Sequence, residues 1–122
     1  MGVISDKSFQ FALNVVDVFK QLNLEKKEFV MSKQLLRSGT AIGALYREAE
    51  YAETRLDFIH KLSIAQKECS ESIYWIELLR LAELIDQKDY ETLTTQSMNL
   101  MQLIKRSIIT AKSNKSDKKE EK

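Results

Sequence analysis

The chain has 122 residues, of which 43% are hydrophobic and 30% charged, and this is the composition of one ordinary globular domain. It contains no proline and only three glycines, and such scarce turn signals predict an all-helical fold. The net charge of +1 gives no bulk attraction to nucleic acid or to a membrane surface, so binding of either would need a local patch.

Apolar residues recur at helical spacing along most of the chain. They predict four helices, at about 6–24, 28–48, 55–84 and 87–111. The remaining segment, 113–122, is mixed in charge and has no apolar residue, so we predict a disordered charged tail. The positions expected to face the core are Phe11, Ala12, Val15, Val16, Val18, Phe19, Leu22, Phe29, Met31, Leu35, Leu36, Ile42, Leu45, Phe58, Ile59, Leu62, Ala65, Cys69, Ile73, Ile76, Leu79, Tyr90, Leu93, Ser97, Leu100, Met101, Ile104 and Ile108.

Polar residues suited to helix capping precede three of the four helices. Ser5 or Asp6 is the expected cap of the first helix. Thr54 is the expected cap of the third, with Asp57 three residues on in the manner of a capping box, and Asp86 is the expected cap of the fourth.

The second helix should begin near Lys27 or Glu28, after a short polar loop. Four amphipathic helices with short loops predict an antiparallel, up-down-up-down four-helix bundle over residues 1–112. Gly39 and Gly43 are four residues apart and share one face of the second helix. Each glycine costs roughly 1 kcal/mol in a helix interior, so the pair indicates a close helix–helix crossing, with a hinge or ligand cleft as the alternative. We also regard both glycines as candidates for an oligomer or partner interface.

Cys69 is the one cysteine of the chain, which excludes an intramolecular disulfide and favours a reducing cytoplasm. The N-terminal residues lack a basic start followed by a long apolar run. No apolar stretch approaches the roughly 18 residues of a membrane span. We therefore expect a cytoplasmic protein without a signal peptide or membrane segment.

Tyr74 and Trp75 fall near the edge of the apolar stripe of the third helix. Large exposed aromatic residues on a small bundle indicate an oligomer or partner interface. The alternative is that both rings pack on the first or fourth helix of the same chain.

Residues that could support catalysis or metal binding are few. The spacing of Asp57 and His60 is that of di-iron bundles, but such a site needs two acid–histidine pairs and the chain has one histidine. Cys69 lies on the apolar stripe, where an inert thiol is expected. The acidic residues Glu48, Glu50, Glu53 and Asp57 are typical of a solvated, salt-bridged helix corner, and acid–base chemistry or a cation site there is the alternative. We predict no enzyme, no cofactor, no metal site and no small-molecule substrate.

The basic residues of one chain are only a weak indication of nucleic-acid binding. If copies of the chain formed a ring, the same residues would line its rim and make many phosphate contacts. The alternative is ordinary solvated charge. The candidate phosphate contacts are Lys26, Lys27, Lys33, Arg37, Lys105 and Arg106.

Three segments carry a resemblance to a known family: SKQLLRSGTAIGA (32–44), EAEYAE (48–53) and DFIHKLSIAQKECSESIYWIELL (57–79). Together they resemble the bacterial four-helix bundle family, also called the 23S rRNA intervening-sequence protein family. The resemblance implies an antiparallel bundle that assembles into a homopentameric ring. It also points to a distant relative, the accessory variability determinant protein of diversity-generating retroelements, which resembles a basic pentameric ring that binds nucleic acid and a reverse transcriptase.

These observations predict a non-enzymatic, homo-oligomeric bundle that serves as a binding or scaffold module. RNA or an RNA-associated protein is the expected partner besides the chain itself. The alternative is a protein–protein adaptor ring with no role in nucleic-acid binding.

Overall fold

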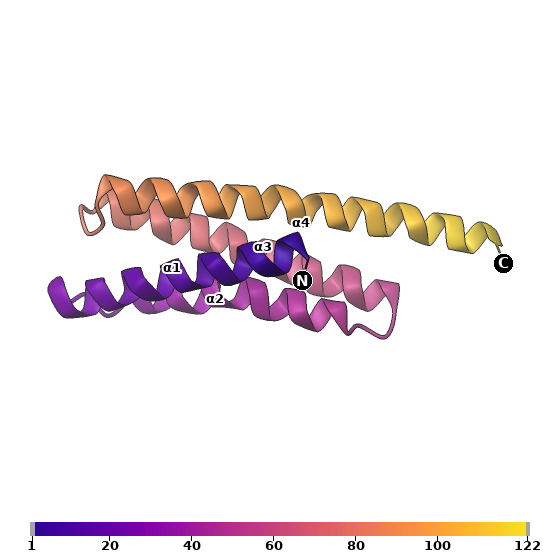
Figure 1. Ribbon diagram of the computed structural model, residues 1–122, viewed down its shortest axis with the longest axis horizontal. Helices are drawn as coiled ribbons and strands as arrows, with labels where there is room; N and C mark the ends of the chain where they lie inside the picture. Colours follow the sequence, from indigo (N-terminus) through magenta and orange to yellow (C-terminus); the bar gives the residue numbers. More distant parts are fainter. Residues whose placement is uncertain (1, 122) are drawn as a thin grey trace.

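The computed structural model describes residues 2–121, with side chains as far as Asn114, and it contains four helices and no strand within those residues (Figure 1). The prediction of an all-α chain with four helices is confirmed. The helices are α1 (Val3–Glu25), α2 (Met31–Glu50), α3 (Arg55–Leu81) and α4 (Gln87–Glu121).

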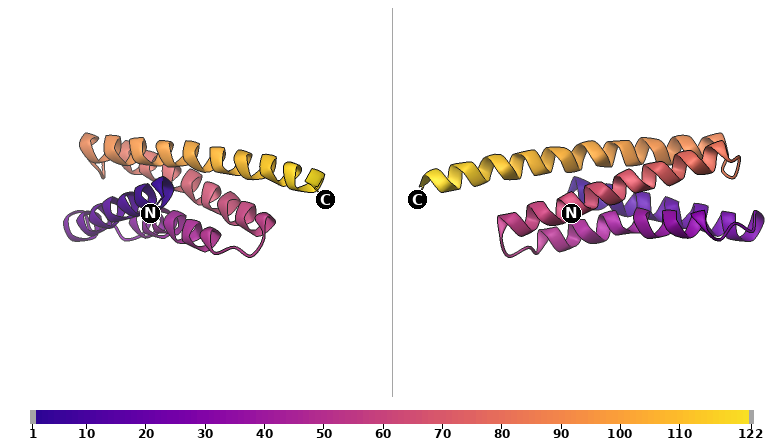
Figure 2. Two further views of the ribbon diagram at one scale, coloured as in Figure 1. Left: turned by 45° about the vertical axis from the view of Figure 1, so that its right-hand side comes forward. Right: turned by 180° about the vertical axis from the view of Figure 1, so that it is seen from behind.

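Each helix packs against the next one along the chain, and α4 packs back against α1. The helices run in alternating directions, as the two views of Figure 2 show. One continuous cluster of apolar side chains fills the space between them. Its fully buried large members are Phe11, Val15, Leu22, Leu35, Ile42, Leu62, Cys69, Ile76, Leu79, Leu93, Leu100 and Ile104. The prediction of a buried Phe29 is wrong: this residue lies in the loop before α2 and is 57% exposed.

Two predicted caps are confirmed. The Thr54 hydroxyl accepts the backbone N–H of Asp57 at 3.0 Å at the start of α3. A carboxylate oxygen of Asp86 accepts the backbone N–H of Asp89 at 2.8 Å at the start of α4. Each bond satisfies one of the backbone donors that a helix start leaves without an internal partner.

The predicted cap of α1 is wrong. The helix begins at Val3, and the extended residue Gly2 occupies the cap position without a side-chain bond. Its carbonyl accepts the backbone N–H of Asp6 at 3.1 Å. Ser5 is buried inside the helix instead of capping it.

The second helix begins at Met31, later than predicted, because Glu28 caps it from the loop. The Glu28 carboxylate accepts the backbone N–H groups of Val30, Met31 and Ser32 at 3.0, 2.9 and 2.7 Å. Burial by itself raises the pKa of Glu28, but the bonds from Met31, Ser32 and Val30 together outweigh it and lower that pKa. The preceding residue, Lys27, takes the left-handed φ of 54° that turns the chain.

The third helix ends at Leu81, short of the predicted 84, because Glu83 adopts a left-handed φ of 61°. The Leu84 N–H then donates to the Leu79 carbonyl, and the Glu83 N–H donates to the Arg80 carbonyl, both at 3.0 Å. This pattern is a Schellman ending with glutamate in the place where glycine is commonest.

The fourth helix continues to Glu121, past the predicted end at 111, and its C-terminal part extends beyond the α2–α3 loop (Figure 1). Helical backbone therefore covers most of the segment 113–122, for which the sequence predicts a disordered tail. The side chains from 115 onward and residue 122 lie outside the described residues, so disorder of this segment stays a prediction.

The α1–α2 contact is the close crossing that the glycine spacing indicates. A Cβ atom on Gly39 would lie 2.9 Å from Cγ2 of Val15, closer than carbon atoms pack. A Cβ atom on Gly43 would lie 3.0 Å from Oγ of Ser8. The two glycines let the backbone of α2 approach α1 of the same chain, and their part in an oligomer stays a prediction.

Candidate interaction surfaces

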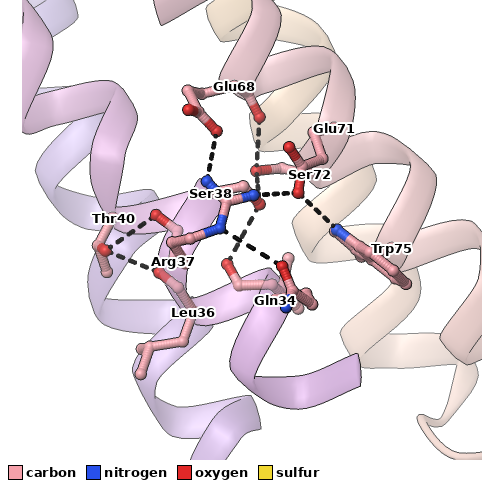
Figure 3. A network of polar contacts seen from close by, with 10 residues as sticks. Gln34, Leu36, Arg37, Ser38, Thr40, Glu68, Glu71, Ser72 and Trp75 are labelled. Carbon is pink, nitrogen blue, oxygen red and sulfur yellow. Dashed lines mark hydrogen bonds and ion pairs between the residues drawn. The ribbon is translucent and has the colours of Figure 1, made fainter. Parts of the chain in front are cut away.

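A polar network joins α2 to α3 on the outside of the bundle (Figure 3). Arg37 extends from α2 between two carboxylates of α3, donating to Glu68 at 3.1 Å and to Glu71. The hydrogen bond to Glu71 is the largest influence on the pKa of Arg37 and raises it. Burial opposes this rise, and the hydrogen bond to Glu68 and the charges of both carboxylates add to it, so the pKa is raised overall. Arg37 is about half exposed, so this network orders side chains more than it stabilises the fold.

The same network fixes an aromatic pair. The indole N–H of Trp75 donates to the Glu71 carboxylate at 3.0 Å. This bond, and then the bond from Arg37, lowers the pKa of Glu71. The Tyr74 ring stands edge-on to Trp75 with 4.9 Å between ring centroids. Tyr74 is 59% exposed, whereas Trp75 is half-buried and packs against the core.

Two buried serines lie beneath the network and connect the same helices. The hydroxyls of Ser38 and Ser72 are 2.8 Å apart, and Ser72 also donates to the Glu68 carbonyl at 3.0 Å. Both hydroxyls are shielded from water and have hydrogen-bond partners, as buried polar groups usually do. The packing of α2 on α3 that brings these serines together also places Arg37 opposite Glu68 and Glu71.

The six candidate phosphate contacts do not form one site. Lys26, Lys27 and Lys33 come from the α1–α2 loop and the start of α2, and all three are exposed. Lys105 and Arg106 lie on α4, where neighbouring residues point about 100° apart around the helix. Lys105 lines a shallow groove with α3, and Arg106 lines a different cleft near α1.

The candidate contacts also differ in whether they are paired. Among the residues whose side chains are described, Arg37 is the one member of the six held in ion pairs, and its two carboxylates compete with any phosphate. The other five are exposed and in no ion pair within that part of the chain. The charges available for a nucleic acid are therefore the lysines near the α1–α2 loop and the two residues on α4.

A second exposed surface runs along the outside of α1 and α2. Phe9 is 54% exposed, and Leu13 follows one turn later on the same side at 46%. The Arg47 guanidinium carbon lies 5.6 Å from the centre of the Phe9 ring, a cation–π contact from α2. Phe9 and Leu13 are absent from the predicted core and from the predicted interface. Their repeat four residues apart, outside the core stripe, was the signal available in the sequence.

A cleft of about 770 Å³ opens where α1 begins, because α1 starts short of the α2–α3 loop while α4 continues past it (Figure 1). Apolar side chains of all four helices line it, including Ile4, Tyr46, Phe58, Leu103 and Ala111. Burial, and then the charge of Glu50, raises the pKa of Tyr46. The volume is that of a small-molecule pocket, and the mouth is open to solvent.

The residues considered for catalysis lie in different surroundings. Cys69 is buried, its thiol donates to the Ser97 carbonyl at 3.2 Å, and burial raises its pKa to about 11. His60 is exposed on α3. At the acidic junction, Glu48 pairs with Lys61 at 3.0 Å. Among the described residues no group of three or more histidine, cysteine or acidic side chains is arranged to hold a metal ion.

Within the described residues, none of the helices combines the length and the apolar character needed to cross a membrane.

Comparison with known proteins identifies relatives of the chain. A family model described as the 23S rRNA-intervening sequence protein matches residues 3–106. Among solved structures, the chain is similar to the crystal structure of a protein of unknown function from the S23 ribosomal protein family of Bacteroides thetaiotaomicron VPI-5482. The two chains are 51% identical with a TM-score of 0.85, over 87% of this chain and 98% of that chain. No curated protein matches. Because the family model spans all four helices, the chain belongs to the 23S rRNA-intervening sequence protein family.

Proposed function

We propose that this protein is a non-enzymatic, self-associating scaffold of the cytoplasm whose partner is RNA or a protein bound to RNA, and that it assembles as a homopentameric ring. The observation that carries the RNA part is the set of exposed lysines at the α1–α2 end, Lys26, Lys27 and Lys33, which meet no carboxylate among the described side chains. Membership in a family described by a ribosomal RNA insertion supports the same partner.

The affinity of this lysine set for RNA depends on its repetition in an assembly. A single chain offers three such charges at one end, and its net charge is only +1. In a ring, each copy adds its own lysines to the same rim, and every phosphate contact releases counterions. The affinity for RNA should therefore rise with assembly and fall steeply with salt.

The test measures binding of single-stranded RNA by fluorescence anisotropy across a salt series. For a single strand, the slope of log K against log salt is about −0.7 for each phosphate contact, so lost contacts flatten it. Lys26→Glu with Lys27→Glu should weaken binding and flatten the slope. Lys88→Glu with Lys112→Glu makes the same charge change on α4 and should act less. Equal effects of the two double variants would contradict a localised contact.

A protein adaptor is the second candidate, and the same end of the bundle favours it. Leu24, Phe29 and Val30 are exposed apolar side chains beside the lysine pair. An adaptor predicts capture of one protein that persists at high salt and is lost in Phe29→Ser with Val30→Ser. RNA binding that survives this variant, but is lost in Lys26→Glu with Lys27→Glu, favours the scaffold for RNA.

A further inference from the structure

The cleft of about 770 Å³ lies at the start of α1, at the other end of this helix from the lysine set (Figure 1). Its apolar walls are well shielded from water. Ile4, Ala49 and Ala111 are buried, and Phe58 and Leu103 are half-buried. The volume is in the range of small-molecule sites, which combine apolar walls with a few placed polar groups.

Four charged side chains line the cleft, and their formal charges cancel. They are Glu50, Glu53, Arg55 and Arg106. None of them is in an ion pair among the described side chains. Glu50, Glu53 and Arg106 are exposed and keep their water, whereas Arg55 is half-buried. The sum of the charges therefore selects no ligand, but the difference in their burial does.

Arg55 is the charged group of the cleft whose hydration is incomplete. Its Nη1 atom is enclosed and meets no hydrogen-bond acceptor among the described residues. Nε and Nη2 are not enclosed in this way, so an acceptor in the cleft can reach the same guanidinium. A buried donor without a partner costs free energy, and the cost is larger for a charged group. An anion beside this guanidinium offsets a charge that water does not fully solvate.

We propose that the cleft binds a medium-chain aliphatic carboxylate. The hydrocarbon chain lies against the apolar walls, and the carboxylate pairs with Arg55. An amphipathic cation is the weaker ligand, because the exposed Glu50 and Glu53 are hydrated and gain little from pairing. The proposal concerns a different end of the bundle from the RNA contacts, and it depends on neither RNA binding nor self-association.

The experiment titrates purified full-length protein with decanoate, below its critical micelle concentration, by isothermal titration calorimetry. Decyltrimethylammonium has the same chain and the opposite charge, so it is the matched ligand. Arg55→Gln removes the cation, and Ala111→Leu fills part of the cleft. Arg80→Gln is the control variant, because it makes the same change of charge at the other end of α3, outside the cleft. Circular dichroism checks that each variant keeps its helices, and Ala111→Met replaces Ala111→Leu if that variant is unfolded.

Wild type and Arg80→Gln should bind one decanoate per chain and should bind decyltrimethylammonium at least about tenfold more weakly. Arg55→Gln should weaken the binding of decanoate about tenfold, as expected for loss of a hydrogen bond to a charged group. Ala111→Leu should weaken it as well, because the chain then has less room. Absence of decanoate binding, equal affinity for the two ligands, or a cleft variant that binds decanoate as tightly as wild type overturns the proposal.

Discussion

Helix α1 packs against α2 on one side and α4 on the other, and the two contacts are built differently. Toward α2, Gly39 leaves no room for a Cβ atom, which would lie 2.9 Å from Val15. Toward α4, a cleft of about 770 Å³ opens at the start of α1, and side chains of all four helices line it. The comparison shows that small residues in α2 allow a close contact with α1, whereas the contact with α4 opens where α1 starts short of the α2–α3 loop.

The substitution with the largest expected effect disrupts the close contact between α1 and α2. Gly39→Leu places a branched side chain where even one methyl group collides with the fully buried Val15, so the backbone must move. Overpacking of this kind costs about 3 kcal/mol in the free energy of unfolding, which urea titration measures.

Alanine at the two glycines provides the matched control. Gly39→Ala should destabilise by about 1 kcal/mol, because overpacking outweighs the gain in helix propensity. Gly43→Ala should be close to neutral, because the atom it meets first is the rotatable hydroxyl of Ser8. If both alanine variants were equally stable, the contact would be looser than the structure has it.

The turn that begins the close contact depends on Glu28. Glu28→Ala removes the acceptor for three backbone N–H groups and should destabilise by about 1 kcal/mol near neutral pH. The pKa of Glu28 is lowered in the folded state, so its stabilisation is present above the ordinary value of 4.5 and is lost as pH falls through the folded value.

Urea titrations of wild type and Glu28→Gln at several pH values measure this dependence. The difference between the two proteins should shrink as the pH falls below 4.5. Glu25→Gln makes the same change of charge at the end of α1, outside the cap, and should show a smaller difference. A gap between wild type and Glu28→Gln that is constant with pH would rule out the carboxylate as the capping group.

The features that the sequence predicts well depend on residues close together in the chain. The caps at Thr54 and Asp86 each involve a donor three residues later, so a local pattern is sufficient. The glycine pair in α2 lies on one face by spacing alone. The buried stripes follow the helical period in the same way.

The helix ends that were misplaced have no such local signal. Gly2 caps α1 without a side chain, and Glu28 caps α2 from outside the helix. Glu83 ends α3 in a left-handed conformation. Glycine or asparagine at that position would have predicted this ending, but glutamate does not. The first helix was therefore placed at Ser5 or Asp6, which have the expected capping chemistry, and the other two ends were placed from the polar loop and the apolar stripe.

The interaction surfaces depend on residues far apart in the chain. Arg37 meets Glu68 and Glu71 through the packing of α2 against α3, which also brings Ser38 and Ser72 together. Spacing within α2 cannot predict what lies opposite on α3. The sequence therefore predicted Arg37 as a phosphate contact and gave no sign of the two carboxylates that pair with it.

On the open side of α1, one polar contact to α4 can be isolated. The Asn14 amide donates to the Gln96 side chain at 3.0 Å, and both residues are half-buried. A double-mutant cycle with Asn14→Ala and Gln96→Ala should give a coupling of about 0.5 kcal/mol. Asn14→Ala with Gln87→Ala, which share no contact, should be additive. A coupling of several kcal/mol would mean that this side is as closely packed as the other.

The smallest expected effect is that of a substitution in the cleft, and it tests most directly whether this side of α1 is open. Ala111 lines the cleft, so Ala111→Leu can place its added carbons in empty space. Leucine and alanine have similar helix propensities, and burial of the new side chain offsets its lost freedom. The free energy of unfolding should therefore change by less than about 0.5 kcal/mol. The same substitution at Ala65, which is fully buried in the closed core, should cost about 2 kcal/mol. Equal costs at the two positions would mean that the cleft is closed in solution, and the contrast between the two sides of α1 would disappear.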